Sequence, residues 1–153
     1  MIFTTRETPM KSIFLWAAMG LCLAGSVFAE GVTHRVAIHV DENDPQVMNM
    51  ALNNAKNVAS YYESQGDDVI IEVVTYGPGL NMLIEGKSPV AKRVATMSLE
   101  LDNISFAACA NTMAGMKKKT GKDVVLLDEA QVVPSGVVQL ITLQENGYSY
   151  IRP

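Results

Sequence analysis

The chain has 153 residues, of which 48% are hydrophobic and 18% charged, and its formal net charge at pH 7 is −4. This length suits one globular domain, and the acidic balance argues against a general nucleic-acid-binding protein, which usually presents a basic face. Only two cysteines are present, Cys22 and Cys109, so the chain has no tetracysteine metal site.

The first 29 residues have the pattern of a secretory signal peptide. Arg6 and Lys11 precede a short apolar run over 13–24, and the small residues before position 30 predict cleavage after Ala29. An uncleaved membrane anchor is the less favoured alternative, because spanning a bilayer takes roughly 20 apolar residues. We therefore predict a periplasmic protein with no membrane attachment after cleavage, and one mature domain over residues 30–153.

Cleavage would leave a single cysteine in the mature chain. Cys22 departs with the signal peptide, so Cys109 has no partner for an internal disulfide. One unpaired cysteine in an exported protein suggests a free reactive thiol or a link between chains. Without Arg6, Lys11 and Glu7, the totals of 12 basic and 16 acidic residues become 10 and 15, a net charge of −5.

The first half of the mature chain predicts a strand, a long helix and a second strand. Residues 33–40 form the first strand, whose apolar end is typical of a strand covered on both faces. Asp44 and Pro45 are a good N-cap and first-turn residue for a helix over 45–64, and Gly66 is its predicted stop. The second strand lies within 67–76, rich in β-branched residues. The helix has one apolar face at helical spacing: Val47, Met48, Ala51, Leu52, Ala55, Val58, Ala59 and Tyr62.

The second half continues the alternation of strands and helices. A turn at Gly77-Pro78-Gly79 precedes one or two helical turns over 80–85, and Ser88 is the predicted N-cap of a helix that ends at Asn103. The remaining elements are a strand over 104–108, a helix over 111–119, a short strand within 124–127, 131–133 or both, a helix over 137–145 and a strand over 148–151. This order predicts an α/β fold with three layers: a mostly parallel sheet of about five strands and helices on both faces.

Cys109 is the main candidate for chemistry. It follows a predicted strand and directly precedes a helix N-terminus, where free backbone N–H groups and the helix dipole favour a thiolate. Ligands of open α/β sheets bind at the carboxyl ends of the strands, which is where Cys109 would lie. A buried structural cysteine is the alternative, because free cysteine is often a small core residue.

Five further residues are predicted to share that edge of the sheet as ligand-binding groups: His39, Asp41, Gly77, Asn111 and Thr112. Each has a plainer interpretation. A histidine in an apolar strand is more often a hydrogen-bonded core residue than a base. Asp41 and its neighbour Glu42 are expected in solvent and would raise the pKa of a nearby thiol. Gly77-Pro78-Gly79 lacks the spacing of a phosphate loop. No motif calls for a metal or another cofactor.

Four stretches give the chain a resemblance to the DsrE/DsrF-like family, and specifically to its exported members. They are His39-Val40-Asp41-Glu42-Asn43-Asp44-Pro45, Leu52-Asn53-Asn54-Ala55-Lys56-Asn57, Glu72-Val73-Val74-Thr75-Tyr76-Gly77-Pro78-Gly79-Leu80 and Phe106-Ala107-Ala108-Cys109-Ala110-Asn111-Thr112. The resemblance covers nearly all of 33–153. It implies a DsrE-like parallel α/β domain, assembly into homo-oligomers (trimers or hexamers), and a place in sulfur metabolism in which a cysteine holds sulfane sulfur as a persulfide. Cys109 stands at the family's cysteine position.

Two functions from different classes follow. In the first, the protein is a periplasmic sulfur or thiol carrier, similar to a sulfurtransferase without a full catalytic apparatus. Cys109 would then exchange sulfur with a thiol or persulfide partner protein. In the second, the domain is a non-catalytic oligomeric module that binds a small ligand, and Cys109 is merely buried.

Overall fold

The computed structural model describes residues 1–2 and 31–153. Apart from residues 1–2, the predicted signal peptide, with its cleavage site and Cys22, therefore lies outside the described residues. Within the described part, no helix has both the length and the apolar character needed to cross a membrane.

The elements alternate as the sequence predicts. In chain order they are β1 (Thr33–Val40), α1 (Pro45–Gln65), β2 (Asp68–Thr75), the 3₁₀ helix η1 (Gly77–Leu83), α2 (Ala91–Glu100), β3 (Ile104–Cys109), α3 (Ala110–Thr120), β4 (Ala130–Val133), α4 (Gly136–Glu145) and β5 (Ser149–Ile151).

All five strands are parallel, in the order β4-β3-β2-β1-β5. The chain adds β2, β3 and β4 on one side of β1 and then returns through α4 to place β5 on the other side. The strand order therefore reverses between β1 and β5, and this reversal is the topological switch point of the sheet. The α/β prediction, with about five strands and a mostly parallel sheet, is confirmed.

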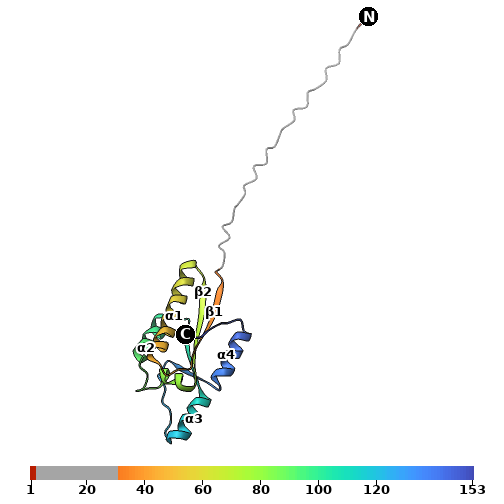
Figure 1. The fold of residues 1–153 in the computed structure, drawn as a ribbon. Coiled ribbons are helices and arrows are strands. Elements are labelled where there is room, and N and C mark those ends of the chain that lie inside the picture. Colours follow the sequence, from red (N-terminus) through yellow and green to blue (C-terminus); the bar gives the residue numbers. More distant parts are fainter. Residues whose placement is uncertain (3–30) are drawn as a thin grey trace.

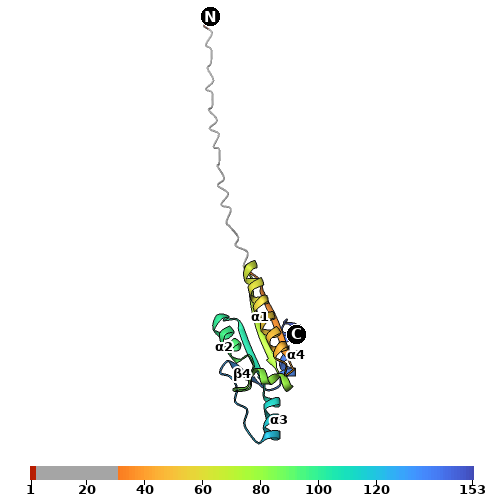
Figure 2. The ribbon, with the colours of Figure 1, turned by 60° about the vertical axis from the view of Figure 1, so that its left-hand side comes forward.

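Helices lie on both faces of the sheet (Figures 1 and 2). The face that carries α1, α2 and η1 holds the main core, with Phe106, Ile38 and Leu52 among its fully buried side chains. The face under α4 holds a smaller core of Ala37, Val74, Ala107, Leu140 and Leu143. α3 extends beyond the carboxyl ends of the strands and has no fully buried residue.

The ends of α1 confirm the predicted local signals. The Asp44 side chain accepts a hydrogen bond from the Gln46 backbone N–H at 2.7 Å, and Pro45 is the first helical residue. The helix stops at Gly66 as predicted, which also ends its buried face of Met48, Ala51, Leu52, Ala55 and Ala59.

Three local predictions need correction. The N-cap of α2 is Val90 rather than Ser88, whose hydroxyl instead accepts from the Val90 N–H at 3.3 Å and donates to the Met82 carbonyl. The residues 77–79 are the first turn of η1 rather than a separate turn. Of the two candidate segments for a short strand, only 131–133 lies in one, because 124–127 forms a single antiparallel bridge, between Leu126 and Ile84.

Candidate functional site

The carboxyl ends of the strands place the candidate residues along one rim. β1 ends with His39 and Val40 and leads into Asp41, and β3 ends with Cys109. The register pairs His39 with Val74 of β2 and Val74 with Ala107 of β3, so the three strands end at the same level of the sheet. The predicted residues therefore gather at one edge of the sheet, but in two groups.

Cys109 is the last residue of β3 and the N-cap of α3, and only 4% of it is exposed. Burial raises the pKa of its thiol. The Thr112 hydroxyl and the backbone N–H groups of Gly136, Thr112 and Asn111 lie near the thiol as hydrogen-bond donors, and together they outweigh burial and lower its pKa. These N–H groups belong to the first turns of two helices, α3 and α4, whose dipoles both favour negative charge on the sulfur. The sequence predicted the contribution of α3, but not that of α4.

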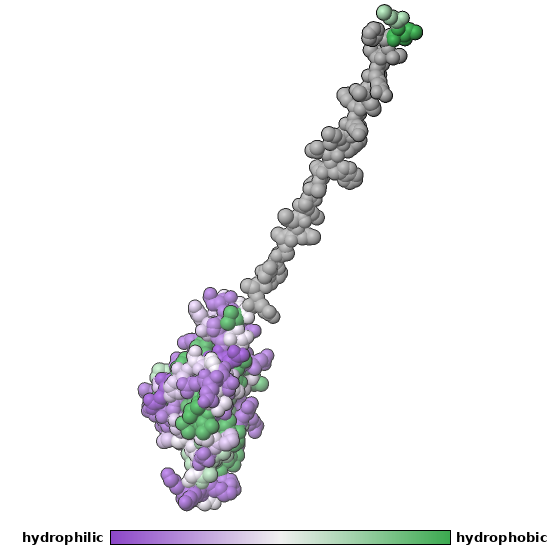
Figure 3. Space-filling view, turned by 90° about the vertical axis from the view of Figure 1, so that its right-hand side faces the viewer, coloured by the Kyte–Doolittle hydropathy of each residue, from purple (hydrophilic) through white to green (hydrophobic). Residues whose placement is uncertain are grey.

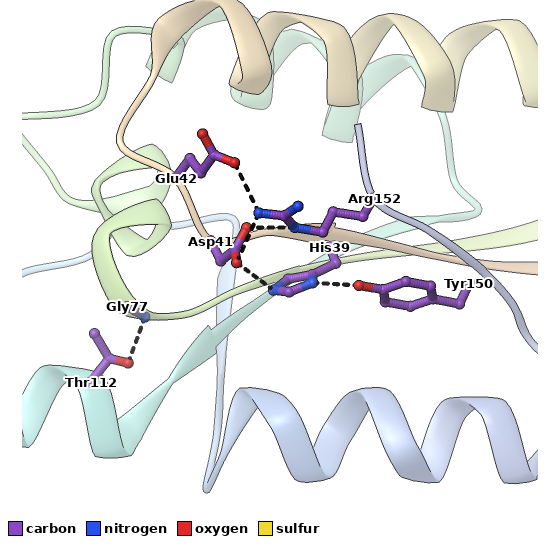
Figure 4. Close-up of polar contacts among 7 residues, drawn as sticks. All are labelled: His39, Asp41, Glu42, Gly77, Thr112, Tyr150 and Arg152. Atoms are coloured by element: carbon purple, nitrogen blue, oxygen red, sulfur yellow. Dashed lines mark hydrogen bonds and ion pairs between the residues drawn. The ribbon is translucent and has the colours of Figure 1, made fainter.

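Thr112 is held in place by Gly77. The Thr112 hydroxyl oxygen accepts a hydrogen bond from the Gly77 backbone N–H at 2.9 Å, as Figure 4 shows. Since this oxygen is occupied as an acceptor of that N–H, its one hydrogen is free for the sulfur. Gly77 has φ +54°, a left-handed conformation that a side chain would strain, so a glycine here directs the N–H toward Thr112.

The second group is built around His39, which is 4% exposed. Its Nδ1 lies 2.7 Å from the Tyr150 hydroxyl of β5, and its Nε2 lies 3.9 Å from Asp41 Oδ2. Nε2 is buried and has no hydrogen-bond partner in the described part of the chain. Burial lowers the pKa of the imidazole more than the nearby Asp41 carboxylate raises it, so His39 is neutral at pH 7.

Asp41 and Glu42 share one arginine (Figure 4). Arg152 donates from Nε to Asp41 Oδ1 at 3.0 Å and from Nη2 to Asp41 Oδ2 at 3.3 Å and to Glu42 Oε1 at 2.9 Å. Slight burial raises the pKa of Asp41. The hydrogen bonds from Arg152 and the proximity of His39 outweigh burial and hold the pKa below its ordinary value, so the carboxyl stays ionised. The two carboxylates and one guanidinium leave this group with a net charge of −1.

Tyr76 lies between the two groups. Its ring stacks on His39 with centroids 4.6 Å apart. It also packs against Gly136, where an added Cβ would lie 2.7 Å from Tyr76 Cδ1. Burial and the negative groups Asp41 and Cys109 raise the pKa of its phenol, which therefore stays protonated. Because Gly136 has no side chain, the N-terminus of α4 can lie against the Tyr76 ring and bring the Gly136 N–H near the thiol.

The predicted site residues divide accordingly. Cys109, Thr112, Asn111 and Gly77 lie together as one unit, in which the Asn111 backbone N–H donates to the Pro134 carbonyl at 3.3 Å and the Asn111 side chain is exposed. His39 and Asp41 form the other. No hydrogen bond or ion pair between described residues joins the two units. The expectation that Asp41 and Glu42 raise the thiol pKa is wrong, because Arg152 offsets their charge and neither acts on Cys109.

The sequence reading missed three residues of the rim: Gly136, Tyr150 and Arg152. Tyr150 and Arg152 reach the rim only because β5 pairs with β1, a neighbour more than 100 positions away. The sequence Pro134-Ser135-Gly136 predicts that a helix begins near Gly136, but it does not predict that this helix begins beside Cys109 of β3. Among the residues that the structure covers, no three His, Cys, Asp or Glu side chains converge as a metal site.

Comparison with known proteins places the chain beside one of unassigned activity. A solved structure of a protein of unknown function, MTH1491 from Methanobacterium thermoautotrophicum, is 33% identical in sequence, with a TM-score of 0.67 over 78% of this chain and 99% of the other. At that identity and coverage, the chain belongs to one family with MTH1491. No family model matches the sequence. No curated protein matches it either.

Proposed function

We propose that this chain is a periplasmic sulfur carrier of the DsrE/DsrF-like family, which holds sulfane sulfur as a persulfide on Cys109. The observation that carries the proposal is the environment of the sulfur. One side-chain hydroxyl and backbone N–H groups from two helix N-termini lie around it, and they lower the pKa of the thiol despite its burial. A purely structural core cysteine needs no such donors.

The transfer step needs no oxidant or reductant. The Cys109 thiolate attacks the outer sulfur of a hydropersulfide donor, R–S–SH. The S–S bond of the donor breaks, its electron pair leaves on R–S⁻, and the new S–S bond forms on Cys109 with the hydrogen retained on the outer sulfur. The N–H groups around Cys109 then stabilise the anion of the loaded persulfide. Delivery is the same exchange in reverse, to a thiol of a partner protein.

Intact mass spectrometry tests the proposal. The purified chain is incubated with polysulfide or with a hydropersulfide, and its mass is compared with that of Cys109→Ala. We expect a gain of one sulfur atom that a thiol reductant removes and that Cys109→Ala never shows. An unchanged mass under every donor would refute the carrier function.

The second function, a non-catalytic module for a small ligand, is favoured by one observation: Cys109 is only 4% exposed. Transfer needs the sulfur to be reached, so the two functions differ in accessibility. A small thiol reagent distinguishes them. A carrier is labelled in the native state at a rate that rises with pH, whereas a module with a structural cysteine is labelled only after denaturation.

We also propose that the protein works as a homo-oligomer. An apolar patch lies over one side of α4 (Figure 3). It consists of two valines and one isoleucine, each 50–56% exposed: Val137, Val138 and Ile141. An apolar patch on a soluble domain is typical of an interface between subunits. The patch begins one residue after Gly136, so a neighbouring subunit there would border the thiol site.

Size determination by light scattering tests the assembly. Val138→Lys combined with Ile141→Glu is expected to shift the native mass toward that of one chain. Leu99→Glu is the matched control, because Leu99 is 86% exposed on α2 and lies outside the patch. If the native protein already has the mass of one chain, or if the double variant keeps an assembled mass, the α4 interface is wrong.

A further inference from the structure

The buried nitrogen of His39 is the one polar group at the rim that the thiol site leaves unexplained. Among the described residues, His39 Nε2 has no hydrogen-bond partner, although 95% of the side chain is buried. It faces the Asp41 carboxylate, which favours the tautomer with the hydrogen on Nε2, while Nδ1 accepts from the Tyr150 hydroxyl. The donor and its natural acceptor are about 1 Å too far apart for a hydrogen bond. An unmade hydrogen bond of a buried donor is costly, so this separation needs a reason.

Arg152 supplies that reason. It draws Asp41 away from His39 through two hydrogen bonds, at 3.0 and 3.3 Å, and also binds Glu42 (Figure 4). These groups are accessible, since the side chains of Asp41, Glu42 and Arg152 are 28%, 52% and 46% exposed. A ligand carboxylate can therefore take Arg152 over. Asp41 would then shift by about 1 Å and accept a hydrogen bond from His39 Nε2. Asp41 and Glu42 would both be free to bind a cation.

The position of this group in the fold points to a ligand independently. His39 lies in β1 and Asp41 directly follows it, Tyr150 lies in β5 and Arg152 directly follows it, so the group lies where the strand order reverses. Open α/β sheets bind ligands at the carboxyl ends of the strands at such a switch point.

We propose that Asp41, Glu42 and Arg152, backed by His39, recognise a zwitterionic amino thiol, and that the donor of sulfur to Cys109 is the hydropersulfide of such a molecule. The ligand ammonium pairs with Asp41 and Glu42, and the ligand carboxylate pairs with Arg152. The inference rests on the carrier function proposed above and names its donor. A net charge of −1 at this group disfavours dianionic donors such as thiosulfate.

The distance between the two groups suits a molecule of that size. Asp41 follows β1 and Cys109 ends β3, so two strand spacings separate them, about 10 Å in all. An amino thiol such as cysteine hydropersulfide spans about 6 Å from its outer sulfur to its ammonium, given an S–S bond of about 2 Å. With a near-attack approach of about 3.3 Å at the sulfur and a hydrogen bond of about 2.8 Å at the carboxylate, its reach is about 12 Å, which exceeds the separation and lets the ligand pass around the Tyr76 ring.

Binding is tested without sulfur transfer. Cys109→Ala is titrated with S-methylcysteine and with its N-acetyl and methyl-ester derivatives, each followed by NMR shifts of backbone amides. We expect S-methylcysteine to shift amides near 39–42 and 150–152 and to bind at least tenfold more tightly than either masked derivative. Glu42→Gln, an exposed change that leaves the fold intact, and Asp41→Asn are both expected to weaken binding. Asp123→Asn is the matched control on an exposed ion pair far from the rim. No binding, or equal binding of all three compounds, overturns the inference.

Sulfur transfer to the wild-type chain separates this inference from the carrier function. Loading of Cys109 is followed by mass with cysteine hydropersulfide, N-acetylcysteine hydropersulfide and thiosulfate. We expect at least tenfold faster loading from the free amino thiol, and loss of that preference in Glu42→Gln. Equal rates from all donors would overturn the recognition site and leave the carrier intact. No loading from any donor would overturn the carrier instead.

Discussion

Replacing Thr112 by valine removes the side-chain hydroxyl that lowers the pKa of the Cys109 thiol and preserves the shape of the side chain. The Thr112 hydroxyl connects the Gly77 N–H, which it accepts at 2.9 Å, to the thiol. A hydrogen bond to a charged group contributes about 1.5–3 kcal/mol, and each 1.4 kcal/mol or so changes a population tenfold. Thr112→Val is therefore expected to reduce the thiolate fraction at neutral pH by about tenfold or more.

The assay is the ultraviolet absorbance of the thiolate as a function of pH, which does not depend on the access of a reagent to a buried sulfur. The rate of alkylation by a small haloacetamide is the second readout. In Thr112→Val the titration is expected to move to higher pH, toward or beyond that of an ordinary thiol. Thr112→Ser is the matched control, because it keeps both hydrogen bonds and is expected to titrate as the wild type does.

Valine at 112 also leaves the Gly77 N–H without its acceptor, so some loss of stability accompanies the change, about 1–3 kcal/mol. This loss is separable from the electrostatic effect because it appears in the unfolding curve and not in the titration of the folded protein. If the titrations of Thr112→Val and the wild type coincide while Thr112→Val is less stable, Thr112 is structural and the reasoning about the thiolate is wrong.

Two further predictions concern stability and the geometry of the rim. Gly136→Ala is expected to destabilise the fold by about 1–3 kcal/mol in chemical denaturation and to slow alkylation of the thiol, because its Cβ would lie 2.7 Å from the Tyr76 ring. Gly115→Ala, in open space on α3, is its control and is expected to stabilise by about 0.4–1 kcal/mol; equal effects of the two would contradict this packing. Burial raises the pKa of Glu72, so its contribution is full below about pH 4.5 and is lost as the pH rises through the folded value. Glu72→Gln is thus expected to raise the melting temperature by a few degrees at neutral pH and not near pH 4, and a uniform change would refute the sign.

Local signals were enough for the fold. The Asp44-Pro45 start and the apolar face of α1, the β-branched run of β2 and the glycines at helix ends each fix an element without reference to the rest of the chain. Parallel pairing then follows from the alternation of strands and helices. The N-cap of α2 was missed because Ser88 sits in a tight loop that uses its hydroxyl twice, on Val90 and Met82, before the helix begins.

The site was only partly accessible to the same reasoning. Sequence order identified Cys109 and the helix that follows it, because both lie within a few residues. Gly136 reaches the sulfur through the β3–β4 pairing and Arg152 reaches Asp41 through the β1–β5 pairing, and neither contact has a local pattern. One wrong expectation came from missing Arg152: the sequence alone predicts that the carboxylates of Asp41 and Glu42 raise the pKa of the thiol.

The arrangement of charges resolves that conflict in physical terms. A carboxylate beside a thiol raises its pKa when the two share a low-dielectric space. Here the Tyr76 ring stands between them, and Arg152 compensates Asp41 on the far side. Hydrogen-bond donors lie around the sulfur, while the negative group lies two strands away. A rim built in this way can attract a cationic end of a ligand at β1 and still keep a thiolate at β3. Replacing Arg152 by glutamine leaves both carboxylates uncompensated and is expected to raise the pKa of the Cys109 thiol, and an unchanged thiolate titration would refute the compensation by Arg152.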